Sequence, residues 1–250
     1  MLSMKFRVSL SYNPNTAKVH ISSGNSKIGK IPTFNMLPGN DYIELKNGEA
    51  VVNVKGTCGG VCEGCQHSCY AVKGLKLHYN AVAPSNGENT LIMRNNPDLG
   101  FKMIKDYCLK KRRNPIKAFR FHSSGEIIDY NYLVRCYELA KEIPNIQFYL
   151  YTKRFDEVQK LLEEKGDLPS NFVINISEWK DNIKGYNFDK LNKFVWDDGT
   201  DPEIAKLPHC PAVSKPKKIG GKGHMLNVHC DHCGLCWKAN TGRRLAVYNH

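Results

Sequence analysis

Short apolar runs alternate with amphipathic segments through the middle of the chain, and this alternation predicts the fold. The apolar runs are 116–122, 146–151, 172–176 and, more weakly, 194–196. Residues 129–142 and 155–165 repeat apolar positions at the spacing of a helix with one buried face. Strands alternating with helices of this length are typical of neighbouring parallel strands with right-handed crossovers. We therefore predict an α/β fold, a partial parallel β/α barrel, for residues 50–206.

The first fifty residues predict a hairpin followed by a basic loop. Polar residues alternate with the apolar positions Phe6, Val8, Leu10, Val19 and Ile21 on the two sides of a turn at Pro14. The loop 23–32 is rich in glycine and lysine but lacks the spacing of a phosphate-binding loop. From its residues alone we interpret it as an ordinary basic loop, within an N-terminal segment that spans 1–49.

The stretch that leads into the predicted β/α region carries one strand and two helices. The apolar run 50–54 is predicted as the strand that feeds the first cysteines. A helical pattern follows Cys69 and is expected to end at the turn residues 84–87. A second helix is expected to begin around Pro97.

The composition describes a folded, basic protein. Its 250 residues are 41% hydrophobic, enough to bury a sizeable core, so an intrinsically disordered chain is excluded. The formal net charge of +12 favours nucleic acid as a partner, although a generally basic soluble protein has the same charge. Candidate phosphate contacts are Lys27, Lys30, Lys111, Arg112, Arg113, Lys217 and Lys218. No apolar stretch is long enough to span a bilayer, so we expect no membrane partner and a cytoplasmic protein.

Ten cysteines fall mainly into two groups, at 58–69 and 210–236. Grouping of this kind indicates metal binding in a reducing compartment rather than disulfide bonds. Cys108 and Cys136 stand apart and recur with apolar neighbours at helical spacing, so we expect both thiols to pack in the core.

The first group consists of Cys58, Cys62, Cys65 and Cys69. The spacing Cys58-x3-Cys62-x2-Cys65 is that of the radical S-adenosylmethionine (SAM) enzymes, in which three thiolates hold three irons of a [4Fe–4S] cluster. The fourth iron is then open to bind the amine and carboxylate of a small molecule. Cys69 supplies a fourth thiolate that would close the cluster, and four thiolates would also suit zinc. The sequence leaves these alternatives open.

The ends of the predicted strands carry the candidate catalytic and cofactor-binding residues, because functional groups gather at the carboxyl edge of a parallel sheet. Ser123-Ser124-Gly125-Glu126 resembles the glycine-glycine-glutamate stretch that binds the SAM ammonium group in radical SAM enzymes, with serines in place of the leading glycines. Arg120 and Lys153 are candidates to meet anionic groups of cofactor or substrate. His122 and Glu126 are candidates for acid–base catalysis.

The second group joins Cys210 to Cys230-x2-Cys233-x2-Cys236, in a cysteine-rich extension at 207–250. Cysteines at two-residue intervals with a remote Cys-Pro are typical of a ferredoxin-type [4Fe–4S] site, because such a loop wraps three corners of the cluster. Zinc, bound by some of these cysteines and a nearby histidine, is the alternative. We thus expect two [4Fe–4S] clusters.

Several motifs together resemble the phage gene product 88 family. The matching stretches are the loop 23–35, Cys65-x3-Cys69-Tyr70-Ala71, Arg120-x-His122-x-Ser124-Gly125-Glu126, Phe148-Tyr149-x-Tyr151-Thr152-Lys153, and the C-terminal cysteines with Trp237. The resemblance implies a phage-encoded protein, and with it the cytoplasm of the host cell. It also marks the loop 23–35 as functional, but it implies no reaction.

Three functional hypotheses follow from these residues. The leading one is a radical-SAM-like enzyme that modifies a nucleic-acid base, with Cys58, Cys62 and Cys65 holding the catalytic cluster. The second is a nucleic-acid-binding protein of phage replication or regulation, in which both metal sites are closed and structural. The third is a zinc-containing barrel enzyme that acts on nucleobases, with Glu126 or His122 as the acid or base.

Overall fold

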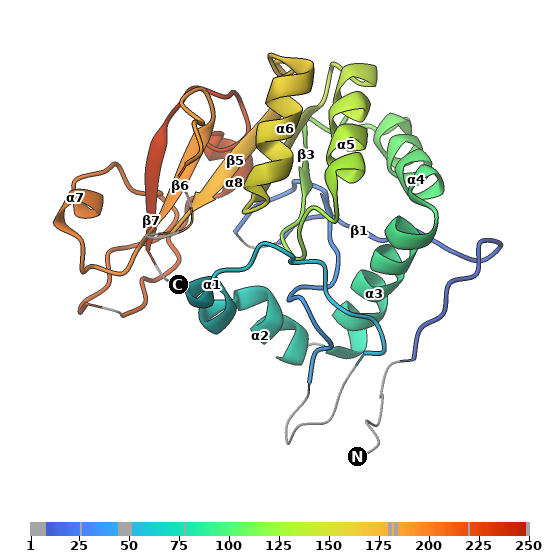
Figure 1. Ribbon diagram of the computed structural model, residues 1–250, viewed down its shortest axis with the longest axis horizontal. Helices are drawn as coiled ribbons and strands as arrows, with labels where there is room; N and C mark the ends of the chain where they lie inside the picture. The colour runs from blue at the N-terminus through green and yellow to red at the C-terminus, as the bar shows by residue number, and fades with distance from the viewer. Residues whose placement is uncertain are drawn as a thin grey trace. The chain divides into compact units, whose positions relative to one another are not determined.

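The computed structural model describes residues 9–25, 27–44, 52–77, 79–179, 182, 185–219 and 221–248. Within these residues the strands form a mixed, mostly parallel seven-stranded sheet in the order β1-β2-β3-β4-β5-β6-β7 (Figure 1). The strands are β1 (Ile21–Ser22), β2 (Thr33–Phe34), β3 (Ala118–Phe121), β4 (Gln147–Thr152), β5 (Phe172–Glu178), β6 (Asn192–Asp197) and β7 (Arg244–Tyr248). The helices are α1 (Glu63–Ser68), α2 (Tyr70–Leu77), α3 (Tyr79–Asn95), α4 (Pro97–Leu109), α5 (Tyr130–Glu142), α6 (Phe155–Lys165), α7 (Pro202–Ala205) and α8 (Cys230–Cys233).

The chain divides into two compact units. The first comprises the residues up to Ser22, 33–115 and 122–139, and the second comprises 23–32, 116–121 and 140–250. In the described part of the chain, every helix is too short or too polar to cross a membrane.

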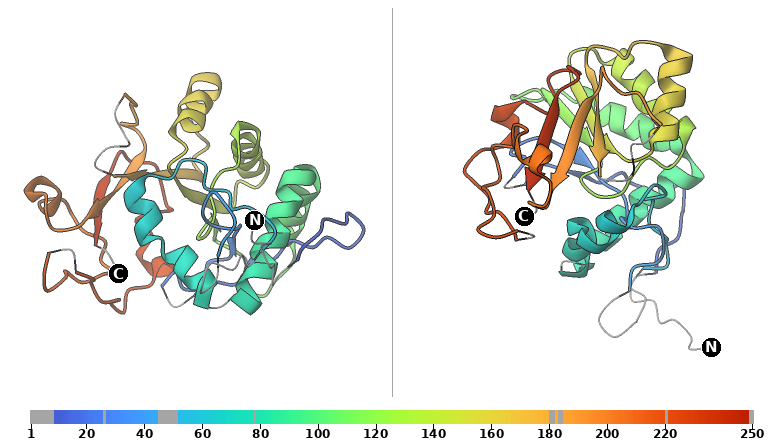
Figure 2. Two further views of the ribbon diagram at one scale, coloured as in Figure 1. Left: turned by 60° about the horizontal axis from the view of Figure 1, so that its bottom comes forward. Right: turned by 60° about the vertical axis from the view of Figure 1, so that its left-hand side comes forward.

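Strands β3 to β7 of the second unit run parallel to one another. Phe119 and Phe121 of β3 are level with Phe148 and Leu150 of β4, and Leu150 is level with Ile174 of β5. The right-hand view of Figure 2 shows β5, β6 and β7 side by side. The prediction that the central apolar runs are neighbouring parallel strands is confirmed.

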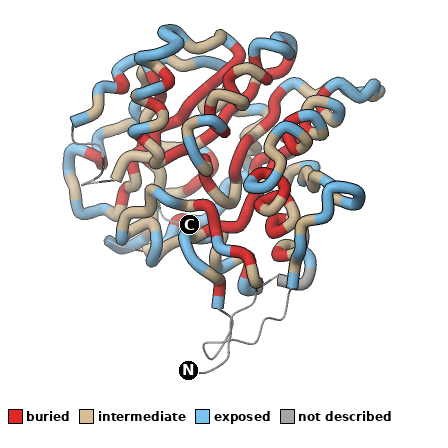
Figure 3. Tube along the Cα trace, turned by 45° about the vertical axis from the view of Figure 1, so that its right-hand side comes forward, coloured by how far each residue is buried: buried red, intermediate tan, exposed pale blue. Residues whose placement is uncertain are grey.

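These strands carry nearly continuous apolar runs because they are buried. Phe148, Tyr149 and Leu150 of β4 are each at most 1% exposed, and Val173 and Ile174 of β5 are fully buried. A parallel sheet covered on its faces selects such sequences rather than a strict alternation of apolar and polar residues. Figure 3 shows the buried segments following the strands.

Helix α6 has the predicted bounds. Phe155, Val158 and Leu161 recur at three-residue intervals and are buried. The helix ends at Gly166, which adopts a left-handed conformation (φ 70°) that residues with a side chain rarely take. The helical period in the sequence therefore sufficed to place both ends.

Strand β7 is not predicted by the sequence pattern. It pairs with β6, with Val195 level with Ala246, and Leu245 and Ala246 are 3% and 0% exposed. Five residues after a cysteine-rich segment carry too little periodicity to stand out. This strand joins the C-terminal cysteine segment to the sheet of the second unit.

Three asparagines attach the C-terminal cysteine segment to the strands. Asn175 Nδ2 donates to the Cys236 carbonyl oxygen (2.9 Å), and Asn192 Nδ2 donates to that of Ala239 (2.9 Å). Asn240 in turn exchanges two hydrogen bonds with the backbone of β5, one donated (2.8 Å) and one accepted (3.1 Å). Asn175 and Asn192 are 0% and 1% exposed, so their amides are committed to these bonds rather than to water.

Helix α3 of the first unit runs through Pro84, so the predicted helix end at 84–87 is wrong. A proline near the start of a helix removes one backbone hydrogen bond, which buried contacts can offset. Here the polar residues that follow it form the buried face. Asn86, Asn89 and Thr90 are 5%, 1% and 0% exposed.

The buried polar residues of α3 hold neighbouring backbone in place. Asn89 Nδ2 donates to the carbonyl oxygens of His20 and Asn35, each at 2.8 Å. Thr90 Oγ1 accepts a hydrogen bond from the Leu37 N–H (2.9 Å). Helix α3 thus fixes the segment 35–37, which also contacts the turn 123–126. The sequence pattern predicts a turn at residues 84–87 of this helix.

Two other expectations fall partly outside the described residues, which exclude 1–8 and 45–51. Within the described part, 9–11 form no strand, and Ile21 pairs instead with Phe34 of β2, antiparallel. The strand predicted at 50–54 is wrong for its described residues, because only Val52 makes a bridge.

The helix expected near Pro97 is confirmed as α4. Asn96 caps it, its Oδ1 accepting from the Leu99 N–H (3.1 Å). Cys108 and Cys136 are 7% and 0% exposed, so the assignment of both thiols to the core is confirmed.

The side chain of Asn171 bonds to the backbone between the end of α5 and the start of β4, and its substitution tests what these hydrogen bonds contribute to stability. Its Nδ2 lies 2.8, 3.1 and 2.9 Å from the carbonyl oxygens of Ala140, Ile143 and Ile146. Carbonyl groups at and just beyond a helix end have no intrahelical partner. We expect Asn171→Ala to lower the free energy of unfolding by about 1 to 3 kcal/mol, because it removes a buried amide whose hydrogen bonds join the end of α5 to the start of β4.

Denaturant unfolding monitored by circular dichroism measures this loss. The matched control is Asn145→Ala, which removes an exposed amide of the same type, and it should change the free energy by less than about 0.5 kcal/mol. Equal effects of the two substitutions would contradict the assigned role.

Candidate metal centres

All ten cysteines lie in the described part of the chain, and none forms a disulfide bond. Eight of them fall in the two predicted groups, and each of these eight is partly accessible rather than buried in the core. Within the described residues, no three cysteine, histidine, aspartate or glutamate side chains are arranged to hold a single metal ion. The two groups belong to different compact units, and each is built separately.

The C-terminal thiols gather around one hollow in the second unit. Cys210, Cys230, Cys233 and Cys236 line it together with apolar side chains and backbone. The Cys210 N–H donates to the Ala246 carbonyl oxygen of β7 (2.9 Å), which ties the remote cysteine to the sheet. The spacing argument therefore brought together the four residues that the fold places around one space.

A short helix and a tight turn shape the three clustered cysteines. Cys230 and Cys233 begin and end α8, and Gly234 follows in a left-handed conformation (φ 73°) with its N–H bonded to the Cys230 carbonyl oxygen (3.1 Å). Trp237 Nε1 donates to the same carbonyl oxygen (2.8 Å). The chain thereby turns back on itself, which is how a short loop presents several thiols inward.

The thiols affect one another electrostatically. Burial raises the pKa of Cys236 to about 12, a Tyr151 hydrogen bond opposes the rise, and the other three thiols add to it. Burial also raises the pKa of Cys230, whereas Lys27 and Arg120 lower it. Four thiols close enough to interact can hold a metal ion or a cluster as thiolates, and the two neighbouring cations favour the thiolate form of Cys230.

The loop 23–32 lies against α8. The Cys230 N–H donates to the Lys27 carbonyl oxygen (3.1 Å), and Asp231 Oδ2 accepts from the Lys30 N–H (2.9 Å). At Gly29 (φ 69°) an added Cβ would lie 2.2 Å from the Asp231 carboxylate, so only glycine permits this approach. The glycines of the loop therefore serve a close contact with the cysteine segment.

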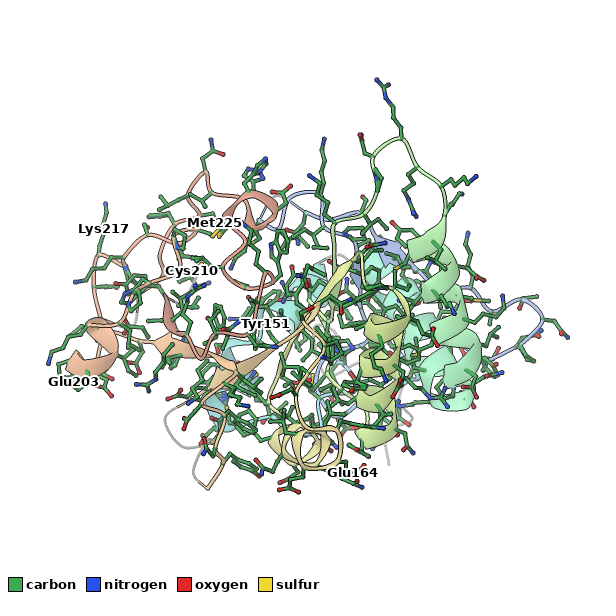
Figure 4. The ribbon with its side chains drawn as sticks, turned by 90° about the horizontal axis from the view of Figure 1, so that it is seen from above. Tyr151, Glu164, Glu203, Cys210, Lys217 and Met225 are labelled. Carbon is green, nitrogen blue, oxygen red and sulfur yellow. The ribbon has the colours of Figure 1, made fainter. Side chains whose placement is uncertain are left out.

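Arg120 and Tyr151 line the sheet side of the same group. The Arg120 guanidinium lies 4.9 Å from the centre of the Tyr151 ring and 6.0 Å from that of Tyr149. The Tyr151 hydroxyl donates to the Cys236 sulfur, and burial raises the pKa of that hydroxyl well above its usual value. Figure 4 shows Tyr151 on its strand and Cys210 on the C-terminal segment, with Lys217 farther out.

The first unit assembles the other thiols differently. Cys62 precedes α1, Cys65 lies within it and Cys69 follows it. Burial raises the pKa of Cys58 to about 12, and Glu126, Cys69 and Cys65 raise it further. Cys58, Cys65, Cys69 and the acid of the Ser-Ser-Gly-Glu stretch are thus within electrostatic range of one another.

Thr57 connects the first cysteine to the turn 123–126. Its Oγ1 accepts from the Glu126 N–H (2.9 Å), and its own N–H donates to the Leu37 carbonyl oxygen (3.0 Å). Glu126 is 7% exposed, and its Oε1 accepts from the Ile127 N–H (2.8 Å). The carboxylate is therefore held in one direction beside Cys58.

The backbone of the same turn is used to pack the unit. Tyr70 Oη donates to the Ser123 carbonyl oxygen, and the Ser124 carbonyl oxygen accepts from the Met36 N–H (2.9 Å). At Gly125 (φ 84°) an added Cβ would lie 2.8 Å from the Met36 Cβ and 2.9 Å from Thr57 Oγ1. The carbonyl oxygens of Ser123 and Ser124 already accept hydrogen bonds within the unit. The Glu126 carboxylate is therefore the main group of this turn that could bind a ligand.

His122 immediately precedes this turn and carries backbone strain. His122 is 3% exposed. Its φ of 60° is positive, and among the described residues every other positive φ belongs to a glycine. Its Nε2 shares a hydrogen bond with the Tyr132 hydroxyl (2.8 Å). The strained residue turns the chain from the end of β3 into the Ser-Ser-Gly-Glu stretch.

Two of the remaining candidates, Lys153 and Arg112, pack on aromatic rings. Lys153 Nζ lies 5.7 Å from the centre of the Trp179 ring, which stacks on Trp196 (4.6 Å between centroids). Arg112 covers the Tyr107 ring at 4.4 Å. The side chains exposed to solvent are Lys30, Lys111, Arg113, Lys217 and Lys218.

The sequence analysis missed the asparagines that fix the site of the second unit. Asn175 and Asn192 interrupt otherwise apolar strands, and both are buried. A polar residue in a fully buried strand needs a partner. A polar residue within an apolar strand was therefore the available signal in the sequence. It does not indicate which group the asparagine side chain bonds to.

Comparison with known proteins agrees with the sequence motifs. The sequence model of the family described as "Gene product 88" matches residues 9–239. The "Gene 88 protein" of Mycobacterium phage L5 is 25% identical over 225 residues, which cover 84% of this chain and 90% of that relative. No solved structure matches the chain significantly.

Proposed function

The chain belongs to the gene product 88 family, and we propose that it is an iron–sulfur protein with two cluster-binding sites. One observation carries the proposal: Cys210, Cys230, Cys233 and Cys236 line a single hollow, with two cations acting on the same thiols. Four cysteine thiolates are the usual ligands of a [4Fe–4S] cluster. The donor set therefore fits such a cluster.

The ferredoxin-like spacing of the cysteines favours iron–sulfur over zinc. A zinc site needs its sulfurs at about 2.3 Å from one point. A [4Fe–4S] cluster binds each thiolate through a different iron, so its ligands stand farther apart around a larger space.

For the first unit we propose a second cluster and a radical-SAM-like activity, acting on a nucleic-acid base. The supporting observation is that Glu126 acts electrostatically on Cys58, the first cysteine of the radical-SAM spacing. Such a cluster, when bound with one open iron, would supply the electron that cleaves SAM. Glu126 would hold the cofactor ammonium through a charge-assisted hydrogen bond.

The partial parallel β/α barrel belongs to the same proposal, and the parallel order from β3 to β7 supports it. Arg120 and Lys153 lie in the second unit, where they contact Tyr151 and Trp179. The proposal therefore gives them no part in holding the cofactor at Cys58.

The second candidate is a protein with two closed, structural clusters that binds nucleic acid. Cys69 lies within electrostatic range of Cys58, as a fourth ligand of the same cluster would. The net charge of +12 and the exposed lysines of the C-terminal segment supply the attraction for phosphate. The two candidates differ in whether Cys69 leaves one iron open.

Iron and sulfide analysis tests the shared proposal. After anaerobic purification we expect about four irons and four sulfides for each cluster, and thus about eight of each per chain. Cys233→Ser and Cys65→Ser should each remove roughly half of this content, since each takes a thiolate from one cluster. Cys108→Ser is the matched control, because its buried thiol belongs to neither group, and it should keep the full content.

Recovery of zinc without iron from the anaerobic preparation would overturn the proposal. Iron that survives Cys233→Ser but not Cys65→Ser would place a cluster in the first unit alone.

Electron paramagnetic resonance of the reduced protein, with and without SAM, decides between the two candidates. For the radical-SAM-like enzyme, SAM should change the spectrum, and Cys69→Ser should keep both the cluster and the response. Glu126→Gln preserves shape but removes the charge, and it should weaken SAM binding by about 1.5 to 3 kcal/mol. If SAM does not change the spectrum and Cys69→Ser loses the cluster, the radical-SAM-like candidate is wrong and the closed-cluster candidate is supported.

Salt dependence tests the nucleic-acid partner. We expect binding to DNA or RNA in a mobility shift, with a logarithmic salt slope that falls by about 0.9 for each phosphate contact removed from a duplex. Lys217→Ala with Lys218→Ala should reduce this slope because both lysines are exposed beside the cysteine segment.

The matched control for this pair is Lys160→Ala with Lys165→Ala, which removes the same charge from exposed positions on α6. An equal change in the two double variants would show a general charge effect rather than a contact.

A further inference from the structure

We infer that Lys27, Arg120 and Tyr151 set the reduction potential of a cluster held by the C-terminal thiols, making it an electron-accepting centre rather than a purely structural one. This inference rests on the proposed function, because it presupposes the cluster. It assigns to the loop 23–32 a task that neither its sequence nor the family name states.

Lys27 reaches the thiols because its loop is fixed at both of its ends. Asn25 Oδ1 accepts from the N–H groups of Lys27 (2.9 Å) and Ile28 (3.0 Å), and the Lys27 carbonyl oxygen accepts from the Cys230 N–H (3.1 Å). The side chain is half-buried, whereas that of Lys30 in the same loop is exposed. A lysine placed in this way acts on the sulfur atoms rather than on solvent.

The charge of Lys27 acts on three of the four thiols. The Lys27 side chain lies within electrostatic range of Cys210, Cys230 and Cys236. A cation at this position is therefore close to several corners of the hollow at once. Inside a protein such an interaction is screened far less than at the surface.

Arg120 approaches the same group from the sheet. It stands level with Tyr149 in the parallel pair of β3 and β4, and its guanidinium lies 4.9 Å from the Tyr151 ring. It also acts on Cys230. Because an arginine stays charged in proteins, this second positive charge is permanent.

Tyr151 completes the arrangement with a hydrogen bond to sulfur. It lies two residues beyond Tyr149 on β4, and side chains two apart on a strand share a face. Its hydroxyl donates to the Cys236 sulfur. Hydrogen bonds to cluster sulfurs and nearby positive charge are two of the factors that determine a cluster's reduction potential.

Both the positive charges and the hydrogen bond raise the reduction potential of the cluster. Reduction adds one electron to the cluster and to its four thiolates, and the added negative charge is stabilised by cations and by hydrogen-bond donors. Removing these groups should therefore make the cluster harder to reduce. Two cations and a donor, from three separate elements, are the arrangement on which the inference of electron transfer rests.

A redox titration of the full chain, followed by electron paramagnetic resonance, tests the inference. The signal of the C-terminal cluster is identified as the one that Cys233→Ser removes and Cys62→Ser keeps. Lys27→Met and Arg120→Met retain the long apolar stems but remove the charges. Each should lower the ratio of reduced to oxidised cluster at a fixed potential by about tenfold, which is ~59 mV for a one-electron couple.

Tyr151→Phe, which removes only the hydroxyl, should shift the ratio the same way by a smaller factor. The control Lys30→Met removes an equal charge from an exposed position of the same loop, and its titration should match that of the unmodified protein. Full iron content with unchanged titrations for both Lys27→Met and Arg120→Met would overturn the inference and leave the proposed function intact.

Loss of iron in Lys27→Met is resolved by Lys27→Arg, which restores the charge. Recovery of both iron and potential in Lys27→Arg supports the inference, and failure to recover either overturns it. An unmodified protein that contains no iron would overturn the proposed function itself.

Discussion

The commitment of three asparagine side chains to backbone partners is the constraint on which the second unit depends. A parallel sheet buried this deeply tolerates a polar side chain only where its hydrogen bonds are made, because an unpaired amide costs roughly 1 to 3 kcal/mol. Asn175 and Asn192 meet that requirement through the backbone of the cysteine segment. The segment is therefore held against the strands by hydrogen bonds within the protein, and β7 follows from it along the edge of β6.

This attachment explains why a cation loop and a cysteine loop from opposite ends of the chain meet. Residues 23–32 and 210–236 are far apart in sequence but belong to the same compact unit. Their contact is made by backbone hydrogen bonds at Lys27 and by Asp231, with glycine at position 29 allowing the close approach. Gly29 of this basic loop thus allows close packing against the cysteine segment.

In the first unit a hydroxyl group joins the first cysteine segment to the turn 123–126. Thr57 joins the segment before Cys58 to the turn that carries Glu126, and the strained backbone of His122 directs the chain into that turn. Strain of this kind persists where surrounding contacts determine it, and here the Tyr132 hydrogen bond supplies one of them. A cysteine and a carboxylate from distant parts of the sequence are in this way held together.

The sequence by itself determined the parallel strand order from 118 to 176, the bounds of α6, and the burial of Cys108 and Cys136, because apolar periodicity directly reports which side chains leave water. It also indicated the grouping of Cys230, Cys233 and Cys236, since their spacing is a local property, and the Cys-Pro motif added Cys210 to them. Only the tertiary structure decided that α3 passes through Pro84, that β7 joins the sheet, and that Lys27 and Arg120 face the thiols. Those outcomes depend on partners distant in sequence. Asn89 is buried within α3 because its side chain donates to the carbonyl oxygens of His20 and Asn35. Lys27 lies near the thiols only because its loop folds against the cysteine segment.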